Sequence, residues 1–163
     1  MPTKRMIQHS VTLFNRSGSN PDGSPAYVVT VLSNVYYREN KGVGGMYNPA
    51  DHAVVHIFDD SVVATPGDDT QLDTSLYESL NGESYERALD TPKGEKPYLP
   101  EEEWDVCENK EQYWTLHGKG NDYIVRGDAS FVPLDYSAAR RIVNVKRNQA
   151  GNRRMHGWKV TAE

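Results

Sequence analysis

The sequence predicts an all-β fold, a small β-barrel or sandwich, with a long acidic loop insertion at about residues 64–103. Several short segments rich in β-branched and aromatic residues are separated by clusters of turn-forming residues, which is typical of these architectures. Thirteen glycines and nine prolines also favour short elements joined by turns. The length suits a single domain, residues 1–163, that can bury a core without metals or disulfides.

Three strands are predicted in the N-terminal part of the chain. Residues 7–14 alternate between apolar and polar side chains, as a half-buried strand does. Residues 26–39 are rich in β-branched and aromatic side chains, which predicts one long strand, bent near residues 33–34. Residues 52–60 form the third predicted strand. One face of that strand carries His52, Val54, His56 and Phe58.

The strand pattern then stops, and the charge changes sign. Residues 59–105 hold fourteen Asp and Glu against three Lys and Arg, a balance of −11 within a net charge of −5 for the chain. The flanking residues 1–58 and 106–163 carry +2 and +4. An acidic block of this kind is usually a solvated surface loop, and it can also repel DNA or dock a basic partner.

Within the insertion, only residues 75–89 have helix-like spacing of apolar side chains, and Asn81–Gly82 interrupts them. We therefore expect one or two short helical turns there rather than a firm helix. A long segment without regular structure is unusual inside a compact domain and is often ordered by a partner.

The C-terminal half is predicted to form two successive hairpins. Residues 113–117 and 123–127 are strand-like and flank the glycine-rich sequence GKGND. A strand at about residues 140–147 and a last strand within RMHGWKVTA are joined by the turn NQAGN.

The sequence GKGND, residues 118–122, is predicted to be a hairpin bend rather than a phosphate-binding loop. A phosphate loop must open a helix, whose first N–H groups hold the phosphate, but this sequence leads into a strand-like segment. Gly118 and Gly120 are expected to supply the turn geometry, and Asn121 and Asp122 to close it.

No catalytic, metal-binding or cofactor-binding residue is predicted. There is no G-x-S-x-G nucleophile motif, and Cys107, the single cysteine, lies among acidic residues that raise a thiol pKa. His52 and His56, four apart on a strand, would be about 13 Å apart, too far for one metal ion. A metal- or ligand-binding β-barrel enzyme or module that uses His9, His52, His56 or His117 remains the alternative of another class.

Basic and aromatic residues suggest contact surfaces. The basic C-terminal residues could belong to an ordinary charged hairpin, or could meet phosphates or an acidic patch on a neighbouring copy. The three tryptophans are expected to be core or interface anchors. The C-terminal basic residues are Arg140, Arg141, Lys146, Arg147, Arg153, Arg154 and Lys159, and the tryptophans are Trp104, Trp114 and Trp158.

Two further expectations concern location. No run of about 18 apolar residues is present, so no membrane span is expected. The N-terminus has no long apolar stretch behind its basic residues, so it is not expected to be a signal peptide. The lone cysteine is consistent with a reducing cytoplasm or with assembly in one.

The order of several segments resembles a known family. These segments are MIQHSVTLFNR, YVVTVLSNVYY, HAVVHIF, KPYLPEEEW, YWTLHGKGNDYIVRGD and RRIVNVKRNQAGNRRMHGWKV. Together they are similar to small structural proteins of tailed phages and prophages of Gram-positive bacteria, encoded among the head–tail joining genes. The matching positions are Thr12 to Asn15, Tyr98 to Trp104, Thr115 to Gly127, Ile142 to Val145 and Met155 to Trp158. The chain departs from the family in its longer GKGND turn, in MHGW near the C-terminus and in its long acidic middle.

The resemblance implies a structural virion protein of the phage neck, a stopper or head-completion protein that acts without catalysis or cofactor. Such a protein forms a homo-oligomeric ring beneath the portal and adaptor proteins, retains packaged double-stranded DNA and docks the tail. Its partners would be copies of itself, the portal or adaptor, and the tail terminator or tail tube, with assembly in the host bacterial cytoplasm. A tail terminator or a minor capsid protein is the alternative. The residues we expect at oligomer or partner contacts are Tyr98, Trp104, Arg147, Arg153 and Arg154.

Overall fold

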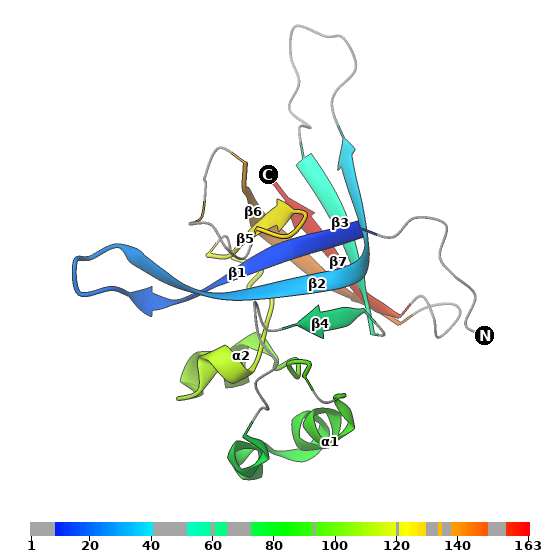
Figure 1. The fold of residues 1–163 in the computed structure, drawn as a ribbon. Helices are drawn as coiled ribbons and strands as arrows, with labels where there is room; N and C mark the ends of the chain where they lie inside the picture. The colour runs from blue at the N-terminus through cyan, green and yellow to red at the C-terminus, as the bar shows by residue number, and fades with distance from the viewer. Residues whose placement is uncertain are drawn as a thin grey trace, which may run out of the picture.

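The described residues of the computed structural model form seven β-strands and four short helical segments (Figure 1). It describes residues 9–40, 52–59, 61–64, 73–92, 94–119, 121–129, 134, 138–149 and 156–163. The strands are β1 (His9–Ser19), β2 (Pro25–Asn40), β3 (His52–Phe58), β4 (Val62–Ala64), β5 (Tyr123–Arg126), β6 (Arg140–Asn148) and β7 (Gly157–Ala162). The helical segments are the 3₁₀ helix η1 (Thr74–Ser79), α1 (Gly82–Asp90), α2 (Glu101–Val106) and the 3₁₀ helix η2 (Lys110–Gln112). The predicted all-β class is confirmed.

The strands pair antiparallel in the order β1-β5-β6-β7-β3-β2-β4, and β1 also pairs with β2. Six strands therefore form a closed circuit of pairings, as in a small barrel, with β4 added beside β2. The length of β2 makes this possible, because residues up to Val35 pair with β1 and residues from Tyr36 pair with β3. The change of partner, between Val35 and Tyr36, comes one residue after Asn34, which the pairing with β1 skips and whose φ of 62° lies in the left-handed region that asparagine tolerates. The predicted bend near residues 33–34 is thus confirmed.

The main core fills the inside of this curved sheet. Its members come from all seven strands and from the segment after η2, so the apolar face of each strand points to one shared interior. They are Val11, Leu13, Leu32, Val35, Tyr37, Ala53, Val55, Ile57, Val63, Trp114, Leu116, Ile124, Ile142, Trp158, Val160 and Ala162.

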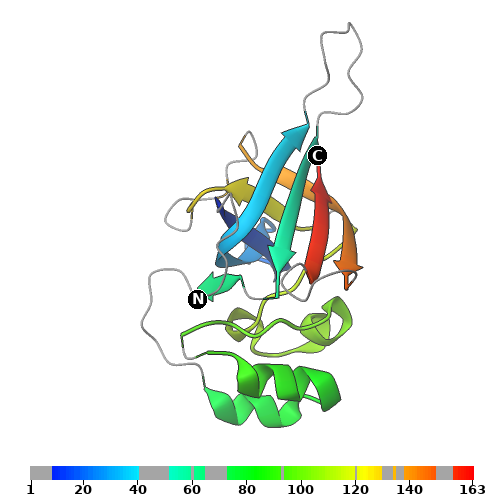
Figure 2. The same cartoon turned by 90° about the vertical axis from the view of Figure 1, so that its right-hand side faces the viewer.

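The described residues of the range 73–112 form a layer that contains the four helical segments and lies at one end of the sheet, below β4 (Figure 2). A second core cluster holds the layer together, made of Tyr77, Ala88, Leu99, Trp104 and Tyr113. The expectation that this region has no firm helix is wrong, because α1 spans nine residues. Asn81 and Gly82 do not break that helix. Asn81 is its N-cap residue, and Gly82, with φ of 51°, begins it and so separates α1 from η1.

The first predicted C-terminal hairpin is also wrong. Residues 113–117 are not a strand; they make one isolated bridge, between Trp114 and Tyr98, with the Leu99 N–H donating to the Trp114 carbonyl at 3.0 Å. β5 pairs instead with β1 and β6. An apolar run that is buried but unpaired has the same side-chain pattern as a sheet strand, so periodicity does not separate the two. The second hairpin, β6 with β7, is confirmed.

Candidate functional site

A groove with a volume of about 510 Å³ lies between α1 and the sheet. One wall comes from α1, including Glu86, Arg87 and Asp90, and the opposite wall from the ends of β3 and β7. Segments far apart in the sequence therefore meet here. We call it the aromatic–acidic groove.

Three aromatic rings form the base of this groove. Tyr98 lies 4.6 Å from Trp158 and 5.0 Å from Trp114, and the two tryptophans lie 5.5 Å apart, measured between ring centroids. Trp114 and Trp158 are almost wholly buried in the main core. Rings held in mutual contact in this way give the groove a rigid apolar surface that lies next to charged side chains.

Two guanidinium groups already lie on these rings. Arg147 lies 4.5 Å from the Trp158 centroid and binds both carboxylate oxygens of Asp59, at 2.6 and 3.0 Å. Arg87 lies 5.3 Å from the Tyr98 centroid and pairs with Glu83 at 3.1 Å. A cation over an aromatic face with a carboxylate beside it is a favourable arrangement, so the groove binds cations of its own chain.

Other carboxylates of the groove have no such partner. Among the described residues, no ion pair joins Glu86, Asp90 or Glu95 to a cation, and burial raises the pKa of Glu95. Lys96, which also lines the groove, is 3% exposed and donates through Nζ to Thr30 Oγ1 at 3.0 Å and to the backbone of β2. Burial lowers the pKa of Lys96 to about 8. Its hydrogen bonds tie the floor of the groove to the sheet.

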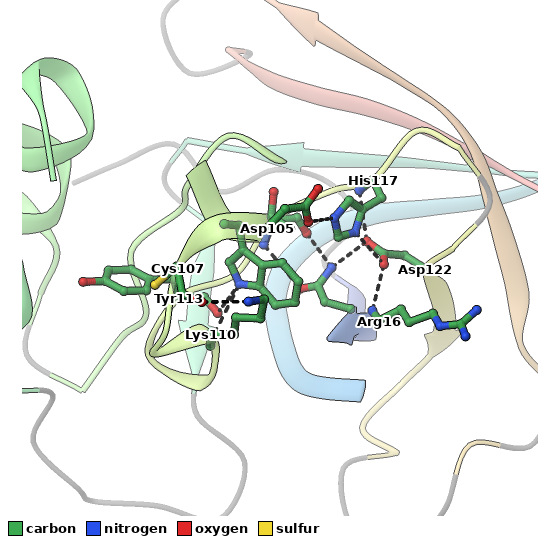
Figure 3. Close-up of polar contacts among 10 residues, drawn as sticks. Arg16, Asp105, Cys107, Lys110, Tyr113, His117 and Asp122 are labelled. Carbon is green, nitrogen blue, oxygen red and sulfur yellow. Dashed lines mark hydrogen bonds and ion pairs between the residues drawn. The ribbon is translucent and has the colours of Figure 1, made fainter. Parts of the chain in front are cut away.

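A second polar centre surrounds His117 (Figure 3). The ring Nδ1 lies 2.8 Å from Asp122 Oδ1, and Nε2 lies 2.6 Å from Asp105 Oδ1. Both ring nitrogens face carboxylate oxygens, so only the doubly protonated imidazolium donates to both. Burial alone would lower the pKa of His117, but the hydrogen bonds and charges of Asp122 and Asp105 outweigh it and raise the pKa to about 9.

Asp122 is the centre of this network and is fully buried. Besides the His117 ring, it accepts hydrogen bonds from the backbone N–H of His117 at 2.9 Å and of Arg16 at 3.0 Å, and from Asn15 Nδ2 at 2.6 Å. Asn15 also donates to the Thr115 carbonyl at 2.8 Å. These bonds fasten Thr115 and Asp122 to β1. A general base needs a free nitrogen lone pair, and the imidazolium has none, so the arrangement is that of a structural lock.

A third feature lies on the outer face of the sheet. Lys159 on β7 is directly opposite Lys146 on β6 and His56 on β3. Directly opposed residues point to the same face, and like charges in such pairs are destabilising. Burial lowers the pKa of His56, and Lys159 and Arg38 lower it further. We call Arg38, His56, Lys146 and Lys159 the cationic row.

The two lysines of the cationic row are exposed, and within the described ranges no carboxylate forms an ion pair with either. The neighbouring arginines differ in this respect. Arg140 lies 3.5 Å from Glu39, and Arg141 lies 3.9 Å from Glu163. The positive charge of the row is therefore left without a described partner inside the chain.

The structure brings together two of the five residues expected at partner contacts. Tyr98 and Arg147 meet at Trp158 in the aromatic–acidic groove. Trp104 is fully buried in the second core cluster, and its Nε1 donates to the Lys110 carbonyl at 3.2 Å, so it is not a surface contact residue of the single chain. Arg153 and Arg154 lie outside the described residues.

Two observations concern metals and membranes. In the part of the chain that the structure describes, no three His, Cys, Asp or Glu side chains cluster closely enough to hold a metal ion. No helix there has the length and apolar character needed to span a bilayer.

Sequence reasoning missed the roles of Asp122 and Asn15. Asp122 was expected only to close a turn, and Gly120 in that turn lies outside the described residues. Asn15 and Asp122 are 107 positions apart, and nothing near either residue indicates the other.

Comparison with known proteins places this fold in a family. The chain belongs to DUF6751, a family of unknown function. The match spans residues 6–163 and therefore includes the sheet, the helical layer and the His117 centre. No curated protein and no solved structure matches the chain. Membership of DUF6751 assigns no activity to the chain.

Proposed function

We propose that this DUF6751 chain is a structural subunit of the tailed-phage neck, a head–tail connector or stopper. Copies of the chain form a ring that joins the portal to the tail and retains packaged DNA. The subunit acts through contacts between proteins and not through catalysis. The order of sequence motifs supports this proposal, and so does the distribution of charge over the fold.

The observation that carries the proposal is the separation of charge between two surfaces. Residues 73–112, the helical layer, contain twelve Asp and Glu against four Lys and Arg. Residues 140–148 and 157–162, which form β6 and β7, contain five Lys and Arg and no Asp or Glu. The helical layer lies at the end of the sheet (Figure 2), whereas the register of β3, β6 and β7 places the cationic row on its outer face.

Two different surfaces of opposite charge favour a head-to-tail contact between copies. Such a heterologous contact closes into a ring when the rotation between neighbours allows it. In this arrangement the cationic row of one copy rests on the helical layer of the next, and its opposed lysines gain carboxylate partners that none of the described residues of their own chain supplies.

Exposed apolar side chains on the helical layer support the same contact. Tyr85 and Leu89 on α1 are 38% and 57% exposed, and Val106 at the end of α2 is 81% exposed. Large apolar side chains within a charged surface are typical of protein interfaces, where their burial adds a favourable free energy.

The test is the oligomeric state of the purified chain, measured by native mass spectrometry. We expect a closed ring for the natural chain. The double variant Lys146→Glu/Lys159→Glu should be a monomer, and Lys119→Glu, at an exposed turn residue, should assemble normally. A natural chain that stays monomeric at all concentrations would contradict the proposal.

The position of the chain in the virion separates the neck from the alternatives. A reconstruction of the assembled particle should place the ring between portal and tail. Density at the tail end of the neck would indicate a tail terminator, and density on the shell a minor capsid protein. Absence from purified virions would contradict all three.

A further inference from the structure

We propose that the aromatic–acidic groove binds residues 1–8 of a second copy, with the side chains of Lys4 and Arg5 in contact with its carboxylates and aromatic rings. This inference rests on the proposed ring and adds a second contact between neighbouring copies, in which the N-terminal segment of one copy binds to the next. It concerns a different surface from the cationic row.

The groove has the chemistry of a cation site. Arg147 on Trp158 and Arg87 on Tyr98 show how it takes guanidinium groups, each with a carboxylate partner beside the ring. Its volume of about 510 Å³ remains available beyond these two side chains. At about 30 Å³ per water molecule, such a space holds side chains rather than a few waters.

Charge balance indicates how much positive charge the groove can take. Five carboxylates line it, against the three cations Arg87, Lys96 and Arg147, which leaves two negative charges in excess. Lys4 and Arg5 are adjacent and supply two positive charges, and the apolar Met6 and Ile7 follow them. A basic pair beside apolar side chains therefore matches both the charge and the aromatic base of the groove.

The starting point of the described chain indicates which copy supplies the segment. His9 begins β1, and its ring lies 6.0 Å from Tyr36, which in turn lies 5.9 Å from His56 of the cationic row. His9, where the described chain begins, therefore lies beside the cationic row, on the face that is proposed to rest on the neighbour's helical layer. In an extended conformation eight residues reach at most about 29 Å, so the proposal requires the neighbour's groove to lie within that distance of His9.

The experiment measures binding of a labelled peptide with the sequence of residues 1–12. The protein is the full chain carrying Lys4→Ser/Arg5→Ser, so that its own segment does not compete. We expect binding that weakens as salt is added, and at least a tenfold loss of affinity when Asp90→Asn and Glu95→Gln are introduced into the groove. The control Asp22→Asn/Glu163→Gln changes two exposed carboxylates outside both the groove and the helical layer and should leave affinity unchanged.

The outcomes separate this inference from the proposed ring. Equal affinity for the groove and control variants, or no binding while the ring still forms, would overturn the inference and leave the ring intact. Peptide binding by a chain that never assembles would overturn the ring, and with it the claim that a second copy supplies the segment. A loss of binding counts only for variants whose thermal unfolding matches that of the parent chain.

Discussion

His117 and Asp122 bind each other twice, through the ring Nδ1 to Oδ1 at 2.8 Å and through the backbone N–H of His117 to Oδ2 at 2.9 Å. The two bonds close a loop of six residues and leave the carboxylate fully buried. Because Asn15 and Arg16 bind the same carboxylate, the loop is fixed to β1. The stability of the chain should therefore depend on this pair.

The first prediction concerns pH. The folded pKa of His117 is raised from 6.5 to about 9, so the protonated ring stabilises the folded chain. That contribution is complete below about pH 6.5 and is lost as the pH rises through about 9, at most about 3 kcal/mol by linkage. Urea unfolding of the natural chain and of His117→Gln, compared between pH 6 and 9.5, measures it.

The comparison between these two chains matters because Lys96 titrates in an overlapping range. The pKa of Lys96 is lowered to about 8, so its burial penalty falls as the pH rises above 8. Both chains contain Lys96, and the difference between them isolates His117. A difference that stays constant from pH 6 to 9.5 would show that His117 is not held as an imidazolium.

The second prediction compares the two carboxylates at His117. Asp122→Asn leaves a buried imidazolium and two backbone donors with a weaker acceptor, and should lower the free energy of unfolding by about 2–4 kcal/mol. Asp105 is 54% exposed, so Asp105→Asn should cost less than about 1.5 kcal/mol. Chemical denaturation of the two variants checks the order, and equal losses would argue against the lock.

The third prediction concerns the close approach of β7 to β3. A Cβ added at Gly157 would lie 2.7 Å from Phe58 Cα and would also collide with the Ile57 backbone. Both residues belong to β3, which is paired with β7, so their backbone cannot shift easily to relieve the clash. We expect Gly157→Ala to lower the unfolding free energy by about 3 kcal/mol or to prevent folding. Gly118→Ala is the control, because its nearest atom is Val145 N at 3.7 Å. A near-neutral Gly157→Ala would show that the two strands are farther apart.

The fourth prediction concerns the exposed apolar residues of the helical layer. Leu89→Ser and Val106→Ser remove side chains that touch solvent in the single chain, so the thermal midpoint should change little. If these side chains are buried between copies, the protein concentration needed for assembly should rise about tenfold or more. Sedimentation velocity measures the change. Unaltered assembly would exclude this face from the contact.

The strands were predictable because their side-chain pattern is local. Residues 7–14, 26–39 and 140–147 carry that pattern, and each lies largely in a strand of the structure. A firm helix α1 was not predicted because Asn81–Gly82 was interpreted as an interruption, whereas Asn81 is the N-cap residue and Gly82 begins the helix.

The candidate sites were less predictable because they depend on distant pairs. Tyr98 and Arg147 were singled out as contact residues, but nothing local indicates that both pack on Trp158. The opposition of Lys146 and Lys159 follows from the register of β6 and β7. Neither this register nor the bond between Asn15 and Asp122 can be inferred from the local sequence, because both depend on how distant segments pair.

The most direct test of the central claim is a charge exchange between the two proposed contact surfaces. One variant, Lys146→Glu/Lys159→Glu, reverses the cationic row, and the other, Glu78→Lys/Glu102→Lys, reverses part of the helical layer. Each keeps one natural surface, so in an alternating head-to-tail ring a contact either is natural on both sides or pairs the introduced glutamates with the introduced lysines. Native mass spectrometry should find each variant monomeric alone and rings containing both in equal numbers after mixing. Rings from either variant alone, or no assembly in the mixture while the natural chain forms rings, would contradict the account.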